Sequence, residues 1–467
     1  MTMDNADEEI TRLKKELSEC PNGYISRKKI QGKDRYYWQW LENGRLRSRY
    51  IKEGDLPKAR EILNHRLALQ EKLKEWKATP EAKSLARNEK KADRNLRELT
   101  GWLMSGDIEI ARVDKGQIVD AKESLLPFFV KRTRDVEEWI ASRAIDRHRT
   151  NSRLLKRVLR LKKTDDFSSA IAVYAATITD RYWFRPEGSG KTYRDIRFSS
   201  NAFDELALRG DSNAFALRPA PTPELTNIGS FEKCWKRKDG FWWLVKRGNP
   251  EELFSELFIC RLGEALGFPM AHYDLNGDCL ISKDFTDGAS VNFEPMKGLT
   301  GEDDDYQRCF ETLFGLSPLL AKEYLRLIYM DTLCFNMDRH TENFGVLRDA
   351  ESGNILALAP NFDNNIALIS RGYPKDRSRK NDGLIRFFAE FLEECPDSRK
   401  MYREMKWKKA TPEMIEICLD EIPIPVDRAY ICDFILNGQR RIQEIIGEGN
   451  EKEVGKHLKK GHRSAGK

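Results

Sequence analysis

Aromatic and aliphatic residues alternate with polar ones over residues 23–52, and this alternation predicts β-strands near the amino end of the chain. Two turn signals, Gln31-Gly32-Lys33 and Asn43-Gly44, divide the stretch into three short runs, and Asn-Gly is the strongest two-residue hairpin signal. The pattern therefore predicts a three-stranded meander. A polar helix is expected before it, over residues 8–20, and a charged helix after it, over about residues 56–77. Because Thr79-Pro80 marks a boundary, residues 1–78 are predicted to form a small basic domain.

Helical periodicity dominates most of the remaining chain. Residues 79–165 are highly charged and predict a helical connecting region, interrupted by a small strand-like piece around residues 108–119. Residues 166–285 combine strand and helix patterns, and residues 286–447 are chiefly helical apart from one hairpin. The lysine-rich residues 448–467 are expected to be disordered. The predicted fold class is α+β.

The composition describes a soluble chain of several folding units. Its 467 residues are about three times the ~150-residue prior for one domain. Hydrophobic residues make up 40% and charged residues 33%, and the mean hydropathy is −0.65. The uncharged stretch over residues 167–179 is shorter than the roughly 18 apolar residues of a membrane span, and the acidic first ten residues do not resemble a signal sequence. We therefore expect no membrane association and a cytoplasmic location.

The cysteines and histidines indicate neither a disulfide framework nor a zinc site. The nine cysteines are scattered without a C-x-x-C spacing, and the six histidines are equally dispersed. We therefore expect any metal ion to be held by oxygen atoms.

Positive charge is concentrated in the predicted meander, although the net charge of the whole chain is only +6. Residues 23–52 contain nine basic residues and only two acidic ones, Asp34 and Glu42. The basic residues are Arg27, Lys28, Lys29, Lys33, Arg35, Arg45, Arg47, Arg49 and Lys52. Strand alternation places Tyr36, Trp38 and Trp40 on one face, which is expected to pack against the following helix. The basic residues then remain available for nucleic acid or for an acidic protein.

The segment N-M-D-R-H-T-E-N-F-G, residues 336–345, follows an apolar-periodic helix and carries the most informative spacing in the chain. Asp338 and Asn343 stand five residues apart, as do the proton-accepting Asp and the magnesium-binding Asn of a kinase catalytic loop. His340, between them, is either a site residue or a structural hydrogen-bonding group. Asp331 on the preceding helix is expected to cap or orient the loop. Two predicted strands then bring Asp363 beside the loop, where its carboxylate can be a second ligand for Mg²⁺.

Upstream residues supply the other parts of a phosphoryl-transfer site. Lys246 ends the strand-like run F-W-W-L-V-K. The segment Asn249-Pro250-Glu251-Glu252 then predicts a helix start, with Asn as N-cap and Glu at the third position, and Gly267 can end this helix. Glu256 lies within it, where it can pair with Lys246. The loop over residues 226–233 precedes this strand. Gly229 and Ser230 allow its backbone to approach phosphates closely, and Lys233 adds a positive charge. Lysine, glutamate, Asp-x-x-x-x-Asn and a later Asp therefore occur in the order in which kinases carry them.

With these residues in place, the chain resembles the HipA-like serine/threonine kinases, specifically a subgroup without the usual HipA amino-terminal module. The resemblance covers about residues 128–446 and rests on the segments S-S-A-I-A-V-Y-A-A-T-I-T-D-R-Y-W-F-R-P, E-L-F-I-C-R-L-G-E-A-L-G, C-L-I-S-K-D-F, N-M-D-R-H-T-E-N-F-G and A-P-N-F-D. It implies a bilobal fold similar to protein and phosphoinositide kinases, with residues 166–285 as amino-terminal lobe and residues 286–447 as helical carboxy-terminal lobe. It also implies ATP and Mg²⁺ as cofactors and a protein hydroxyl as acceptor.

The resemblance further implies a role for individual residues. Asp338 would be the catalytic base, Asn343 and Asp363 the metal ligands and Lys246 the phosphate-binding lysine. The backbone of Lys283, Asp284 and Phe285 would form the hinge that contacts adenine. In the family, a serine in the phosphate loop can be autophosphorylated, which switches the enzyme off; Thr226 occupies the similar position here, and Ser230 is a second candidate.

Some features depart from the family pattern and leave alternatives open. Lys283 stands where related sequences often carry an acid, and Thr226 replaces the usual serine. The amino-terminal third differs from the family's usual module, so an antitoxin-like DNA-binding partner is an expectation from the family alone. The leading hypothesis is an active protein kinase. A role as the toxin of a toxin–antitoxin pair is a further expectation from the family. The alternatives are a nucleic-acid-binding or scaffolding protein with a degenerate kinase domain, and a phosphotransferase that acts on a small molecule.

Overall fold

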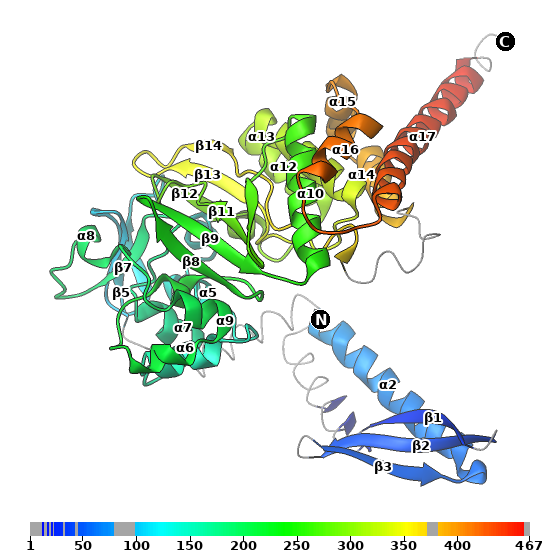
Figure 1. Ribbon diagram of the computed structural model, residues 1–467, viewed down its shortest axis with the longest axis horizontal. Helices are drawn as coiled ribbons and strands as arrows, with labels where there is room; N and C mark the ends of the chain where they lie inside the picture. Colours follow the sequence, from blue (N-terminus) through cyan, green and yellow to red (C-terminus); the bar gives the residue numbers. More distant parts are fainter. Residues whose placement is uncertain are drawn as a thin grey trace. The chain divides into compact units, whose positions relative to one another are not determined.

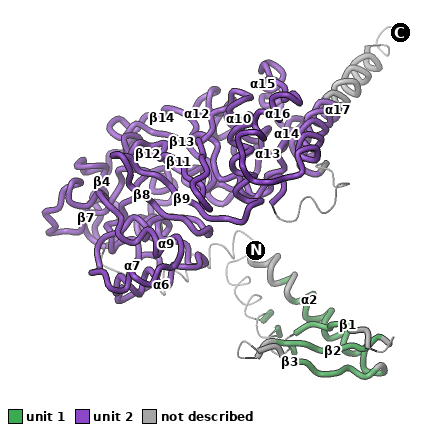
Figure 2. The backbone as a smooth tube through the Cα atoms, in the orientation of Figure 1, with its two compact units in different colours: residues 1–97 green, residues 98–467 purple. Residues whose placement is uncertain are grey.

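The computed structural model describes residues 12–78 with short gaps (14–15, 18–19, 22, 31–32 and 43–44), residues 99–370 and residues 382–461. The chain divides into two compact units, residues 1–97 and residues 98–467 (Figure 2). Each unit is described by itself. Among the described residues, no helix is both long enough and apolar enough to cross a membrane.

Unit 1 contains a three-stranded antiparallel meander followed by a long helix (Figure 1). Strands β1 (Tyr24–Ile30), β2 (Lys33–Glu42) and β3 (Arg45–Ile51) pair in the order β1-β2-β3, and η1 (Glu53–Asp55) leads into α2 (Leu56–Ala78). These elements lie where the sequence pattern predicted them. Trp38 is buried, and the guanidinium of Arg60 on α2 lies 5.7 Å from the ring centroid of Tyr36. The predicted helix over residues 8–20 and the start of the connecting region fall largely outside the described residues.

Unit 2 begins with a four-stranded sheet in a region that the charge pattern had predicted to be mostly helical. Its order is β6-β5-β4-β7, from β4 (Gly101–Ser105), β5 (Ile108–Asp114), β6 (Gln117–Ala121) and β7 (Tyr182–Pro186). The predicted strand-like piece corresponds to β5 and β6, whereas β4 was missed. Strand β4 pairs with β7, about 80 residues away in the sequence, so no local pattern indicates it. Its Leu103 is fully buried, and the ring of Trp102 lies under the guanidinium groups of Arg112 from β5 and Arg185 from β7.

Short helices lie between β6 and β7 of this first sheet and between β7 and the second sheet. The first group is α4 (Phe128–Thr133), α5 (Val136–Ser142), α6 (Ser152–Val158) and α7 (Asp166–Ile171), and the second is α8 (Tyr193–Ile196), α9 (Asp204–Arg209), η2 (Ser212–Ala216) and η3 (Pro223–Thr226). The second sheet has the order β10-β11-β9-β8, from β8 (Lys233–Lys238), β9 (Phe241–Arg247), β10 (Tyr273–Asn276) and β11 (Cys279–Lys283). Helix α10 (Pro250–Leu266) follows β9. It begins with the predicted capping box of Asn249 and Glu252 and ends at Gly267, whose φ is +81°.

The third sheet, β12-β13-β14, and the later helices complete unit 2. Its strands are β12 (Val291–Pro295), β13 (Gly345–Asp349) and β14 (Ile355–Leu358), and the helices are α11 (Lys297–Thr300), α12 (Tyr306–Leu316), α13 (Pro318–Cys334), α14 (Asp382–Glu394), α15 (Pro396–Glu404), α16 (Pro412–Asp420) and α17 (Arg428–Gly461). Within unit 2, Figure 1 shows the sheets gathered on one side and helices α12 to α17 on the other. The architecture is α+β, as predicted.

The largest hydrophobic core of unit 2 lies among these later helices. Phe254 and Phe258 of α10, Ile328 of α13 and Phe388 of α14 are fully buried within it. This core fixes α13, the helix that leads into residues 336–345. Helix α17 extends to Gly461 and so includes residues 448–461 of the predicted disordered tail, whereas its side chains from residue 447 onward and residues 462–467 lie outside the described residues.

Candidate active site

The polar loop of residues 336–345 begins where α13 ends. Phe335 terminates the helix in a left-handed conformation, with φ of +55°. Asn336 then donates from Nδ2 to Asp331 Oδ1 at 3.0 Å, and its Oδ1 accepts the backbone N–H of Asp338 at 3.1 Å. These contacts confirm the prediction that Asp331 orients the loop. Asp331 itself is buried near the end of α13, so its position is fixed.

Arg339 holds this loop against the segment that carries Asp363. Its guanidinium makes a bidentate ion pair with Asp331, with Nε to Oδ2 at 2.8 Å and Nη2 to Oδ1 at 2.9 Å. Nη1 donates to the carbonyl oxygens of Asn343 and Phe362 at 2.7 and 2.8 Å. Burial tends to lower the pKa of Arg339, but the charge of Asp331 outweighs it and the pKa is raised. Sequence analysis did not single out Arg339, although it lies inside the motif.

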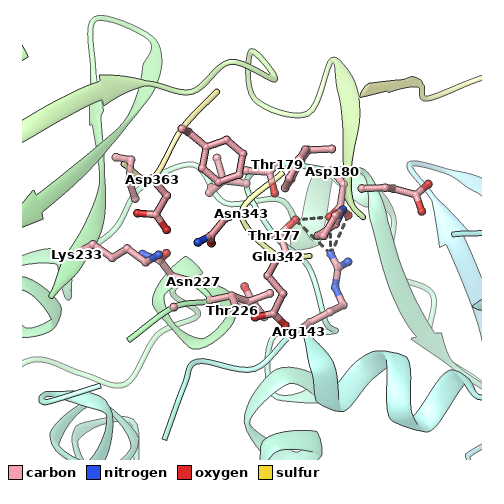
Figure 3. A pocket seen from close by; sticks show the side chains of 18 of the residues that line it. Arg143, Thr177, Thr179, Asp180, Thr226, Asn227, Lys233, Glu342, Asn343 and Asp363 are labelled. Atoms are coloured by element: carbon pink, nitrogen blue, oxygen red, sulfur yellow. Dashed lines mark hydrogen bonds and ion pairs between the residues drawn. The ribbon is translucent and has the colours of Figure 1, made fainter. Parts of the chain in front are cut away.

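The two residues of the Asp-x-x-x-x-Asn spacing face one cavity. Asp338 and His340 are exposed and line it, whereas Asn343 is buried. Asn343 Nδ2 donates to the backbone carbonyl of Asp338 at 3.0 Å, which leaves the Asn343 carbonyl oxygen as the ligand atom of the amide. Figure 3 shows Asn343 and Asp363 on the same part of the cavity wall. His340 Nδ1 lies 3.3 Å from the backbone nitrogen of Glu342.

Lys246 lies at the centre of a buried charged group. Its Nζ is 2.8 Å from Asp363 Oδ1, 3.5 Å from Glu256 Oε2 and 3.3 Å from the Tyr273 hydroxyl. The sequence predicted the contact with Glu256 but not the shorter one with Asp363. Glu256 also accepts the backbone N–H of Asn364 through Oε1 at 3.0 Å, so it fixes both the lysine and the segment that follows Asp363.

The charges of this group favour the ionised forms. Burial opposes the charge on Lys246, but the carboxylates of Asp363 and Glu256 outweigh it and raise the pKa of the amine. Burial likewise opposes the charge on Asp363, yet Lys246 and Lys233 hold the pKa of that carboxyl below its usual range. Asp363 has φ of +64°, a conformation that costs a non-glycine residue about 1–3 kcal/mol and that clusters at active sites.

The predicted phosphate loop lies on the same cavity. Gly229 has φ of +111°, and a Cβ there would lie 2.4 Å from Lys233 Nζ, so glycine both permits the turn and leaves room for the lysine. Burial, together with the charge of Lys246, lowers the pKa of Lys233 to about 8, against the opposing effect of Asp363. Ser230 is exposed, whereas Thr226 is buried and donates its hydroxyl to the Ala176 carbonyl oxygen at 2.6 Å.

The predicted hinge residues also line the cavity, but they differ in what they offer. The backbone N–H of Asp284 donates to the Trp242 carbonyl oxygen at 3.0 Å, so this amide is already used. The Asp284 carboxylate caps the next turn by accepting from Thr286 and Gly288. Burial raises the pKa of Asp284, against these hydrogen bonds. Lys283 is exposed, and its Nζ lies over the ring of Phe241. The side chain therefore does not replace the acidic group that related sequences often carry at this position.

The opposite wall of the cavity comes from Arg143, in the predicted connecting region, and from Thr177 and Asp180, in the predicted amino-terminal lobe. Arg143, just after α5, donates from Nη2 to both carboxylate oxygens of Asp180 at 2.8 and 2.9 Å (Figure 3). Thr177 donates to the same carboxylate at 2.8 Å, and the Arg143 guanidinium lies 4.6 Å from the Trp139 ring centroid. Arg143 and Asp180 are 37 residues apart, so no local pattern pairs them, and the contact was missed.

The cavity has a volume of about 330 Å³, within the range of about 300–1,000 Å³ for small-molecule sites. Lys233 and Lys246 supply positive charge for phosphates. Asn343 and Asp363 supply the amide and carboxylate oxygens that Mg²⁺ prefers. Asp338 is open to an acceptor, and Phe285 belongs to an aromatic cluster with Phe293 and Phe362.

One prediction about metal ligands needs correction. The sequence indicated no grouping of cysteine and histidine, but the fold brings Cys260, Glu264 and His272 together, with their ligand atoms within 4.8 Å of one another. The guanidinium Nη1 of Arg261 lies 3.2 Å from His272 Nδ1, so a cation already occupies this position. The grouping is separate from the cavity because none of its members lines the cavity.

Comparisons with known proteins agree with the geometry. The model of the HipA-like C-terminal domain matches residues 220–414, and a domain of unknown function, DUF6788, matches residues 3–61. No curated protein matched the sequence. Among solved structures, the Helicobacter pylori proinflammatory kinase CtkA is similar at 17% identity and a TM-score of 0.37, over 47% of this chain and 92% of that chain. HipA of Shewanella oneidensis MR-1, from its toxin–antitoxin complex with HipB and operator DNA, is similar at 13% identity and a TM-score of 0.47, over 74% of this chain and 98% of that chain.

Proposed function

This chain belongs to the HipA-like kinase family through residues 220–414, and we propose that it is an ATP- and Mg²⁺-dependent serine/threonine protein kinase. The observation that carries the proposal is the convergence of Lys246, Glu256 and Asp363 on one side of a cavity that Asp338 and Asn343 also line. A domain that had lost phosphoryl transfer would be expected to have lost at least one of these groups, and all five are present.

Each residue then has a definite task. Lys246 and Lys233 bind the phosphates of ATP, and Gly229 lets the loop backbone approach them. Asn343 and Asp363 would hold Mg²⁺, which would supply positive charge to neutralise the phosphates. Glu256 and Arg339 act as positioning residues, because they fix Lys246 and the two metal-binding segments without reaching the cavity centre. Backbone groups of Lys283 and Phe285 remain available for adenine.

The transfer step follows from this arrangement. The hydroxyl oxygen of the acceptor attacks the γ-phosphorus, and its proton passes to the carboxylate of Asp338. The bond between the γ-phosphorus and the oxygen that bridges it to the β-phosphate breaks, and ADP leaves with the electron pair. His340 lines the same cavity as Asp338 and is the proposed contact for the acceptor.

Thr226 is the proposed site of autophosphorylation, with Ser230 second. The Thr226 hydroxyl is buried against Ala176, so the loop must leave this position before the hydroxyl can be phosphorylated. A phosphate of roughly −2 charge does not fit the buried site, and it competes with ATP for Lys233. Phosphorylation would therefore keep the loop away from the nucleotide and switch the enzyme off.

Family membership also supports a cellular role as the toxin of a toxin–antitoxin pair in the cytoplasm, with an antitoxin-like DNA-binding protein as partner. This role requires a cellular protein as phosphate acceptor.

Incubation of the purified chain with γ-labelled ATP and Mg²⁺, with and without cell lysate, tests the proposal. Mass spectrometry then identifies every phosphorylated species. We expect label on serine or threonine of the chain itself and of at least one lysate protein. Label found solely in small molecules would assign the chain to small-molecule phosphotransferases, and the absence of any transfer would refute the kinase assignment.

A further inference from the structure

A buried glutamate at the base of the phosphate loop contacts both ends of the loop. Glu224 belongs to η3, which directly precedes the loop, and its side chain is fully buried. Its Oε2 accepts a hydrogen bond from the side-chain amide of Asn227 at 3.0 Å, where the loop begins. Its Oε1 accepts the backbone N–H of Trp235 at 2.7 Å, in β8 after the loop. One carboxylate therefore joins the two ends of this segment.

The contact with Trp235 lies at the edge of a sheet. Strand β8 is the edge strand of the second sheet, so one side of it has no neighbouring strand among the described residues. Asn201 donates from Nδ2 to Glu224 Oε1 at 2.8 Å and to the carbonyl oxygen of Trp235 at 2.8 Å. Both polar backbone groups of Trp235 are therefore bound by side chains outside the sheet, and these side chains fix the far end of the loop.

An arginine completes the contacts of this carboxylate. Arg149 donates from Nη2 to Glu224 Oε2 at 3.3 Å and from Nη1 to the backbone carbonyl oxygen of Asn227 at 3.1 Å. Glu224 thus accepts four hydrogen bonds, and a carboxylate has about four acceptor sites. The guanidinium therefore holds both the carboxylate and the backbone at the start of the loop.

Arg149 comes from a part of the chain far from the loop in sequence. It lies between α5 and α6, and its side chain is fully buried. The backbone of this segment contacts η3, because the N–H of Ile145 donates to the carbonyl oxygen of Leu225 at 2.8 Å. Burial lowers the pKa of Arg149 and raises the pKa of Glu224, against the attraction between the two charges. Loss of either residue would therefore leave the other without its buried partner.

The segment between the two ends offers backbone donors to an anion. Within the described part of the chain, no acceptor lies within hydrogen-bond reach of the backbone N–H groups of residues 228–232. Consecutive free N–H groups in a turn are typical of phosphate-binding loops. Asn227, at the start of the segment, lines the cavity (Figure 3). A loop whose ends are held together has fewer conformations, so its donors lose less entropy when they bind a phosphate.

We propose that Glu224 and Arg149 are positioning residues for the phosphates of the nucleotide, because they hold the ends of the loop so that residues 228–233 face the cavity. This inference rests on the proposed function, since the ligand is the triphosphate of ATP. Neither side chain lines the cavity, so both act through the loop. Arg149 also lies outside the HipA-like match, which begins at residue 220. Phosphate binding therefore depends on a residue of the preceding region.

A comparison of two ligands separates loop positioning from general stability. Isothermal titration calorimetry of the full chain gives the affinity for a non-hydrolysable ATP analogue with Mg²⁺, and displacement of this analogue gives the affinity for adenosine, which has no phosphates. Arg149→Met should weaken binding of the analogue at least about 10-fold, the equivalent of one hydrogen bond to a charged group. Binding of adenosine should change less than about twofold, because adenosine does not reach the loop.

A second variant and a control make the comparison specific. Glu224→Gln keeps the size of the side chain but has one acceptor oxygen in place of two, so it should also weaken binding of the analogue more than binding of adenosine. The control is Arg261→Met, which removes a largely buried arginine with carboxylates of Asp274 and Glu421 at 2.9 Å. None of these three residues lines the cavity, so both affinities should stay unchanged.

Hydrogen exchange of the unmodified chain tests the proposal without relying on the folding of a variant. The amide of Trp235, although it lies on an edge strand, should exchange at least about 100-fold more slowly than the amides of residues 228–232. Addition of the ATP analogue with Mg²⁺ should slow residues 228–232.

The outcomes distinguish this inference from the proposed function. An unmodified chain that binds neither ligand would refute the proposed function. If the unmodified chain binds both ligands, equal changes of the two affinities in folded Arg149→Met, or no change in either, would overturn this inference alone. Exchange of the Trp235 amide as fast as that of residues 228–232 would also overturn it, because the far end of the loop would then not be held.

Discussion

Nucleotide binding above pH 7 should take up a proton, because the pKa of Lys233 is lowered in the protein without nucleotide. Burial, assisted by the nearby charge of Lys246, lowers the pKa of Lys233 to about 8 from an ordinary value of 10.5. A triphosphate that reaches this amine favours its charged form and raises the pKa again. Those Lys233 amines that are unprotonated at the pH of the experiment must therefore take up a proton when the nucleotide binds.

The size of the effect follows from the pKa. With a pKa of about 8, Lys233 carries a proton in about nine tenths of the molecules at pH 7, in about half at pH 8 and in about one tenth at pH 9. If the bound phosphates hold it fully protonated, binding takes up about 0.1, 0.5 and 0.9 protons at these three pH values. The uptake rises with pH, which is the sign expected of a lysine whose pKa is low in the free protein.

Isothermal titration calorimetry measures this uptake directly. A non-hydrolysable ATP analogue with Mg²⁺ is titrated at pH 8 and 9 in buffers of different ionisation enthalpy, and the slope of the apparent enthalpy gives the protons bound. At these pH values the triphosphate is already fully ionised. Lys233→Gln should abolish the uptake while leaving some binding through Lys246. An uptake that does not depend on pH, or that persists in Lys233→Gln, would refute the reasoning.

Three further predictions concern the surroundings of the cavity. Arg339→Leu leaves the buried Asp331 carboxylate without its partner, so urea unfolding should show a loss of about 3–5 kcal/mol; a loss below about 1 kcal/mol would contradict the structural role. ATP and Mg²⁺ together should raise the melting temperature much more than either alone, and this joint effect should disappear with EDTA or in Asp363→Ala; an ATP shift insensitive to both would remove Asp363 as a metal ligand. Thr226→Ala should stay active during prolonged incubation with ATP while the wild type loses activity as Thr226 is phosphorylated, and identical time courses would eliminate the switch.

Local signals made much of the fold predictable. The Asn43-Gly44 turn and the alternation around it located β2 and β3, and the Asn-Pro-x-Glu start of α10 located that helix to the residue. Such signals act over a few neighbouring positions, so a single sequence contains them in full. Strand β4 was missed for the opposite reason, since its pairing with β7 joins positions about 80 residues apart.

The candidate site divides in the same way. Asp338, Asn343, Lys246 and Glu256 could be found because their spacing along the chain reflects the elements that carry them. The buried contacts of Arg339 join the end of α13, the loop of Arg339 itself and residues 361–364, and nothing in the local pattern around Arg339 distinguishes it from a solvated arginine. The pair of Arg143 and Asp180 was missed because the two residues are 37 positions apart and no local pattern links them.

Asp338→Asn tests the central claim most directly. The side chain is exposed and has no ion pair with any residue that the structure describes, so the substitution should leave the melting temperature and the affinity for the ATP analogue close to those of the wild type. The amide cannot accept the acceptor's proton, and transfer of labelled phosphate should fall by at least 10²-fold. A folded Asp338→Asn chain that binds the nucleotide and transfers phosphate at close to the wild-type rate would contradict the account.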